Sequence, residues 1–179
     1  MKIECRNLLL AISAVLLAGT PALRAELSTL HYPTQDESMF SIEAPGEWEV
    51  TEIKEVGDFG SLESENGSVL QFRAVELESE EEAKKEIDSI FDSTAKFLTE
   101  NYTDVQLDEP QEVSIKGQPG AQLTGSGKDK EGNDVKFLSA MIALGPTTIA
   151  EIWAAVAHEG NDDLAKAQKI LESFKPASN

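Results

Sequence analysis

The sequence predicts an α+β domain in which an antiparallel β-sheet is flanked by helices, an α/β/α sandwich. Short segments of alternating polar and apolar residues, joined by turn residues, are typical of strands. Two longer segments have apolar residues at helical spacing. The order along the chain is strands, helix, strands, helix, which favours an antiparallel sheet over a regular β-α alternation. With 179 residues, 40% of them hydrophobic, the chain can form one domain with a packed core.

Residues 1–25 have the pattern of a secretory signal peptide. Lys2 and Arg6 precede an apolar run over residues 8–19, which is too short to span a bilayer. Cleavage is expected after Ala25 or, as a second choice, after Ala22. The mature chain then lacks cysteine, because Cys5 is the only one. We therefore expect a periplasmic or secreted protein with no stable membrane insertion after cleavage.

The first half of the mature chain is predicted to contain a loose leader, several strands and a helix. Residues 26–38 are polar and contain Pro33, which indicates a flexible leader before a single domain over residues 39–176. Asn66-Gly67 indicates a hairpin, because a type I′ turn needs positive φ at both positions. Ser79 and Glu82 form a capping box before a helix predicted over residues 80–101.

The second half is predicted to form the centre of the sheet and a closing helix. Residues 117–120 (GQPG) are assigned to a turn. Residues 135–144 and 147–156 are apolar on both faces, which predicts a central hairpin. Asn161 is predicted to cap the last helix, whose apolar stripe ends at Phe174.

Three motifs carry a resemblance to a known superfamily. Residues 40–48 (FSIEAPGEW) have an F-x-I-x-x-P-x-x-W pattern, residues 113–121 have a strand–Gly–strand pattern, and residues 170–176 have an I-L-x-S-F ending. Together they resemble the PsbP-like superfamily, which includes PsbP, the Ran-binding Mog protein and DcrB-type envelope proteins. The resemblance implies an antiparallel sheet between helices and a binding or accessory role. A signal peptide fits the bacterial envelope branch.

The net charge of −18 constrains the partners. It argues against nucleic acid and anionic lipid, which need Lys and Arg, and it favours a basic protein partner whose binding is sensitive to salt. Residues 76–112 contain 13 acidic and 3 basic residues, so the helix over 80–101 is the expected docking region. The candidate acidic partner-binding face consists of Glu80, Glu81, Asp88 and Asp92.

No motif in the sequence indicates a catalytic or metal site. His31 and His158, the only histidines, lack an accompanying nucleophile elbow. Residues 129–134 (DKEGND) suggest a calcium loop, but aligning Gly132 to position 6 leaves no oxygen ligand at positions 1 and 12. We therefore expect no cofactor and a non-enzymatic protein of the bacterial envelope that acts through protein–protein contacts. The alternatives are a protein that binds Ca²⁺ or another divalent cation through surface carboxylates and, third, a hydrolase.

The signal peptide is tested by N-terminal sequencing of the secreted protein. We expect the mature chain to begin at Glu26, or at Leu23 if cleavage follows Ala22. A chain that leaves the cytoplasm with Met1 intact would contradict this prediction.

Overall fold

The computed structural model describes residues 27–51, 53, 55–157 and 162–177. The predicted signal peptide and its two cleavage sites lie outside these residues, as do His158 and Asn161. The strands are β1 (Leu27–Tyr32), β2 (Phe40–Pro45), β3 (Glu49–Thr51), β4 (Gly60–Glu63), β5 (Val69–Glu76), β6 (Thr103–Leu107), β7 (Gln111–Ile115), β8 (Gln118–Lys128), β9 (Asp134–Ala143), β10 (Thr148–Ala157) and β11 (Lys175–Pro176). The helices are α1 (Glu80–Asn101) and α2 (Asp163–Ser173).

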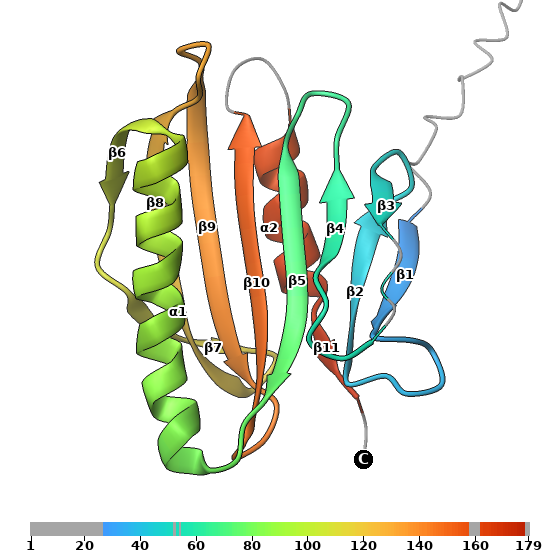
Figure 1. The fold of residues 1–179 in the computed structure, drawn as a ribbon. Helices are drawn as coiled ribbons and strands as arrows, with labels where there is room; N and C mark the ends of the chain where they lie inside the picture. Colours follow the sequence, from blue (N-terminus) through green and yellow to red (C-terminus); the bar gives the residue numbers. More distant parts are fainter. Residues whose placement is uncertain (1–26, 52, 54, 158–161, 178–179) are drawn as a thin grey trace, which may run out of the picture.

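Within the described residues, the strands form two antiparallel sheets. The large sheet has eight strands in the order β3-β4-β5-β10-β9-β8-β6, with β7 also paired to β8. The small sheet has the order β1-β2-β11. The two helices lie on opposite faces of the large sheet, α1 over β8 and β9 and α2 behind β10 (Figure 1). This arrangement confirms the predicted α+β sandwich.

The predicted central hairpin is confirmed, since β9 and β10 lie in the middle of the large sheet. Successive side chains of a strand point to opposite faces, so each of these strands contributes to both helix layers. Ala140 and Ile152 pack with Ile170 of α2. Met141 and Ile149 pack with Ile90 of α1 on the other face. Both faces of β9 and β10 are therefore apolar because a helix packs on each of them.

Helix α1 has the bounds that its capping signals predict. The Ser79 hydroxyl accepts from the Glu82 backbone N–H at 3.2 Å. The Glu82 carboxylate accepts from the N–H of Glu78 at 2.9 Å, one residue before the position of a standard capping box. At the other end, Tyr102 has extended backbone, and the Asn101 amide donates to the Phe97 carbonyl at 2.9 Å.

The prediction of a flexible leader over residues 26–38 is wrong for residues 27–32. They form β1, which pairs with β2 from Leu27–Pro45 to Tyr32–Phe40. Tyr32 is completely buried, its ring stacks on Phe40 at 5.1 Å, and its hydroxyl donates to the Asp58 carbonyl. The sequence pattern failed here because the stabilising contacts come from residues that follow β1 in the chain. The ordered fold therefore begins before residue 39.

The turn predicted over residues 117–120 is displaced towards the N-terminus. Lys116 and Gly117 have φ of 52° and 84°, the positive values of a two-residue type I′ turn. Pro119 and Gly120 already belong to β8, opposite Ser114 and Val113. The hairpin at Asn66-Gly67 is present, but only Gly67 has positive φ, and the loop extends over residues 64–68.

The packing of α2 against β2 gives the first structural test. Phe174 is completely buried and stacks on Phe40 at 5.2 Å, so Phe174→Ala should lower the free energy of unfolding by about 3–5 kcal/mol. Phe97→Ala is the control, because Phe97 is 44% exposed and its main contact is an edge-on aromatic pair, for which the expected loss is about 1.5 kcal/mol or less. Denaturant unfolding of both variants measures the difference. Equal losses would contradict this account of the core.

Candidate functional site

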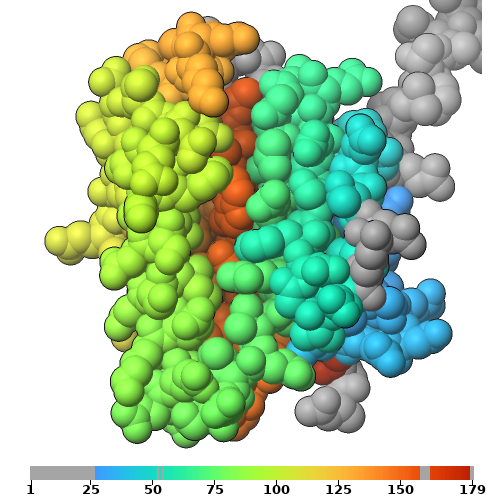
Figure 2. Space-filling model, viewed as in Figure 1, coloured from blue at the N-terminus to red at the C-terminus, as the bar shows by residue number. Residues whose placement is uncertain are grey.

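One half of the large sheet has no helix over it on the α1 side. A helix is about 10 Å wide and strands are about 4.8 Å apart, so a single helix covers about two strands. Because α1 lies over β8 and β9 and also packs on Ile149 of β10, the faces of β5 and β4 beyond it remain open (Figure 1). Figure 2 shows a hollow between α1 and the β4–β5 hairpin, with β10 visible at its floor.

We call this hollow the α1–β5 groove. Its volume is about 570 Å³, which lies within the range of ligand sites. The described residues that line it are Phe59, Val69, Gln71, Arg73, Glu86, Ser89, Ile90, Ser93, Thr94, Phe97, Tyr102, Glu151 and Trp153.

The floor of the groove is determined by the pairing of β5 with β10. Gln71 lies opposite Trp153 and Arg73 lies opposite Glu151, on the face that α1 shares. The Trp153 indole N–H donates to the Gln71 amide oxygen at 3.1 Å, which fixes the orientation of the ring. The alternate residues of β5, including Phe72, are buried on the α2 side of the sheet.

A charged pair lies across these two strands. Arg73 Nε donates to Glu151 Oε2 at 2.6 Å, and Glu151 is only 4% exposed. A carboxylate this far from water requires such a partner, since an unpaired buried charge is strongly destabilising. The Arg73 guanidinium also lies 4.4 Å from the centre of the Phe59 ring, in cation–π geometry. Arg73 is therefore held in place by both neighbouring groups.

Two exposed aromatic rings border the groove. Phe59 is 39% exposed and Phe97 is 44% exposed, and the Phe97 ring meets the edge of Trp153 at 5.6 Å. Aromatic residues, above all tryptophan and tyrosine, and arginine are enriched at the energetic centres of protein interfaces. The groove thus has the composition of a contact surface.

Carboxylates for which the described residues show no ion pair lie in the groove and on the strands beside it. Glu86 projects into the groove from α1. Glu49 and Glu63 lie directly opposite each other across β3 and β4, on the same face as Val69. Like charges in such cross-strand pairs are destabilising. Arg73 is the only basic residue among those that line the groove, and Glu151 already neutralises it.

The predicted acidic face lies elsewhere on α1. Glu80, Glu81, Asp88 and Asp92 are all exposed, and none of them lines the α1–β5 groove. Glu80 pairs with Lys84 and Glu81 pairs with Lys85, each at 2.9 Å. The hydrogen bond from Lys84 lowers the pKa of the Glu80 carboxyl. Part of the negative charge on this face is therefore compensated by lysines of the same helix.

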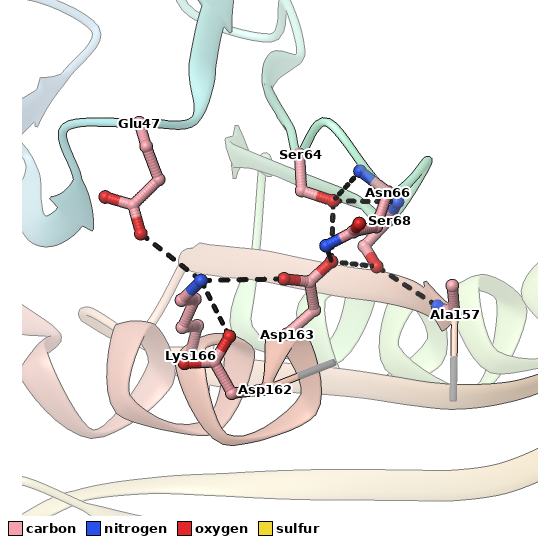
Figure 3. Close-up of polar contacts among 8 residues, drawn as sticks. All are labelled: Glu47, Ser64, Asn66, Ser68, Ala157, Asp162, Asp163 and Lys166. Atoms are coloured by element: carbon pink, nitrogen blue, oxygen red, sulfur yellow. Dashed lines mark hydrogen bonds and ion pairs between the residues drawn. The ribbon is translucent and has the colours of Figure 1, made fainter. Parts of the chain in front are cut away.

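A second polar cluster joins the β4–β5 loop to the start of α2 (Figure 3). Asp163 is fully buried, and its Oδ2 accepts from the hydroxyls of Ser64 at 2.6 Å and Ser68 at 2.7 Å. Ser68 Oγ also accepts from the Ala157 N–H at 3.1 Å, at the end of β10.

Lys166 lies beside the Asp163 carboxylate and pairs with Asp162 at 2.8 Å. The hydrogen bond that Lys166 donates to the Asp162 carboxylate raises the pKa of Lys166. These contacts connect three elements and are all internal, which indicates a role in stability.

The suspected calcium loop is a closed hairpin tip. Asp129 Oδ1 accepts from the backbone N–H groups of Glu131 and Asn133, and Oδ2 accepts from the Asn133 amide, each at 2.9 Å. The bond from the Asn133 side chain is the main cause of the lowered pKa of Asp129. In the part of the chain that the structure describes, no group of three or more His, Cys, Asp or Glu residues is placed to hold a metal ion.

The groove was missed at the sequence level, although the sequence contains signals for it. Phe97 interrupts the polar side of the predicted helix, and Arg73 is the only arginine after residue 24. Neither signal identifies a site by itself, because the pairing of β5 with β10 is not visible in the sequence. The Arg73–Glu151 and Gln71–Trp153 contacts of its floor depend on that pairing.

Comparison with known proteins reveals the fold but no close relative. No family model matches the chain, and no curated protein matches it in sequence. The solved structures it is similar to include cyanobacterial PsbP from Synechocystis, with a TM-score of 0.56 and 11% identity over 90% of this chain and 99% of that one. Another is the Ran-binding protein Mog1p of Saccharomyces cerevisiae, with a TM-score of 0.51 and 13% identity over 85% and 96%.

A third similar structure is a longer protein from Bacteroides thetaiotaomicron, with a TM-score of 0.52 and 12% identity. The match covers 78% of this chain but only 46% of that protein, so the chain spans about half its length. These similarities confirm the predicted PsbP-like fold. Among the described residues, neither helix has the length and apolar character needed to cross a membrane.

The Asp163 cluster is tested by a matched pair of variants. Asp163→Ala removes the acceptor of the Ser64 and Ser68 hydroxyls, and bonds to a charged group contribute about 1.5–3 kcal/mol each, so a loss of about 3–6 kcal/mol is expected. Asp162→Ala is the control, because this neighbouring side chain is exposed and its ion pair with Lys166 contributes less than about 1 kcal/mol.

Denaturant unfolding measures both changes. In a Ser68→Ala background, Asp163→Ala should cost less than it does in the wild type, because one of its donors is already gone. Equal costs in the two backgrounds would show that the hydrogen bond between Ser68 and Asp163 contributes nothing.

Proposed function

We propose that this chain, which has the PsbP-like fold, is a non-enzymatic binding or accessory protein that acts through protein–protein contacts. The observation that supports the proposal is the α1–β5 groove, where exposed aromatic rings border a part of the sheet that no helix covers and a fixed arginine lies on its floor. Such a surface buries apolar area when a second protein covers it. Mog1p, which has a similar fold, is a Ran-binding protein.

The charge of the chain supports a basic partner. At −18, the protein attracts cationic surfaces over several ångströms, and this attraction increases the rate of association more than the final affinity. Asp88 and Asp92 are exposed one turn apart on α1, and no ion pair of either is found within the described residues. We assign them, with Glu80 and Glu81, the role of steering the partner towards the molecule.

We also propose that the protein acts in the bacterial envelope, as a periplasmic or secreted protein. The apolar run over residues 8–19 and the basic residues before it support export, and the N-terminal sequencing described above tests it.

Capture of the partner tests the proposed function. The tagged mature chain, incubated with envelope extract of its source, should retain a basic protein at low salt and lose most of it at about 0.5 M salt, where the Debye length is only a few ångströms. The double variant Asp88→Asn/Asp92→Asn should retain about twofold to fivefold less partner. Glu109→Gln/Glu112→Gln, which removes two exposed carboxylates elsewhere, should retain the wild-type amount.

Two results would contradict the proposal. One is the absence of any enriched protein at low salt. The other is a partner whose retention is the same at both salt concentrations, because steering by surface carboxylates requires a salt dependence.

A further inference from the structure

We propose that the α1–β5 groove binds a basic, amphipathic peptide segment of the partner. An apolar side chain of that segment lies against Phe97 and Trp153, and a lysine or arginine faces Glu86. The inference rests on the proposed function and deepens it, since it names the site and the chemistry of the occupant.

The length of the groove matches a peptide segment. Its wall on α1 extends from Glu86 to Phe97, and these eleven residue steps correspond to about 16 Å along a helix. An extended segment of about five residues, or a helix of about three turns, covers that length. A single inserted side chain would occupy only a small part of it.

The backbone of the floor determines how the segment is held. β5 pairs with β4 on one side and with β10 on the other, and β10 pairs with β5 and β9. No strand edge is therefore available inside the groove, and the segment cannot be bound as an added strand. Its affinity must come from side chains that contact the aromatic rings and the polar groups of the wall.

The exposed aromatic rings determine where the apolar side chain of the peptide binds. Phe97 and Phe59 border the groove, and Trp153 lies on its floor with the indole oriented by Gln71. An apolar side chain that enters here covers exposed surface of the phenylalanine rings and removes it from water. The Trp153 ring that it meets is already held in one orientation, so little conformational entropy is lost there on binding. The wall of α1 adds the hydroxyls of Ser89 and Ser93, which can bond to the peptide backbone.

The charges around the groove favour a cation over an anion. Arg73 is paired with Glu151, whereas no ion pair of Glu86, Glu49 or Glu63 is found in the described part of the chain. Glu49 and Glu63 face each other across adjacent strands, an unfavourable arrangement that a nearby cation relieves. An acidic segment would add repulsion from all three carboxylates.

Model peptides test the inference with the full mature chain. The probe is a fluorescein-labelled eleven-residue peptide of leucine and lysine in amphipathic order, measured by fluorescence anisotropy at low salt. Two control peptides separate the contributions: one has serine in place of leucine, and the other has glutamate in place of lysine. We expect the leucine–lysine peptide to bind at least about tenfold more tightly than either control, and to protect Trp153 from acrylamide quenching.

Variants of exposed residues locate the site. Phe97→Ser should weaken binding about tenfold, since it removes the anchor contact, and Glu86→Gln about twofold to fivefold. The matched controls are Leu27→Ser, which removes an exposed apolar side chain on β1, and Glu112→Gln, which removes an exposed carboxylate on β7. Each control should change the affinity less than twofold.

Three outcomes would overturn the inference. The serine–lysine peptide could bind as tightly as the leucine–lysine peptide, which would indicate diffuse attraction of charge. Phe97→Ser and Leu27→Ser could have equal effects, which would place the peptide elsewhere. A small apolar dye could be bound at Trp153 without competition from any peptide, which would indicate a small-molecule site.

Partner capture by the same variants distinguishes this inference from the proposed function. If Phe97→Ser and Glu86→Gln retain the captured partner while Asp88→Asn/Asp92→Asn loses it, the function holds and the groove assignment is wrong. If no partner is captured but the peptide results are as expected, the groove binds basic segments and the proposed function is wrong.

Discussion

The antiparallel pairing of β5 with β10 is the contact on which the rest of the structure depends. It places Leu70, Phe72 and Ile152 on the side of α2, where they join the main apolar core. The same register turns Arg73, Glu151 and Trp153 towards the side of α1. Because alternate residues of a strand point to opposite faces, a shift of one residue would exchange the two sets and bury the charged pair in the core.

The width of the sheet leaves part of this face uncovered by α1. An eight-stranded sheet is wider than one helix, and α1 covers the strands on the β8 side. On the α2 side, the small sheet and its aromatic residues extend the cover, with Phe40 between Tyr32 and Phe174. The open part of the α1 side therefore contains aromatic, polar and charged side chains that contact one another. A partner can still reach the exposed ones among them.

Local signals predicted much of the fold. The capping residues of α1 and the double-sided apolar pattern of β9 and β10 depend on neighbours in the sequence, and both predictions were correct. The prediction for residues 26–38 failed because β1 is stabilised by β2 and by the loop around Asp58. The turn at Lys116-Gly117 was misplaced because Pro119 and Gly120 resemble turn residues, although β8 accommodates both.

The sequence by itself determined the acidity of the protein, the bounds of α1 and the class of the fold, because these follow from composition and from contacts within a few residues. Only the tertiary structure decided where a contact surface can form. Arg73 and Glu151 are 78 residues apart, and Phe97 belongs to a third element that reaches them only when α1 is seated on the sheet. Contacts over such separations depend on strand register and on the limited width of a helix, and neither leaves a local pattern in the sequence.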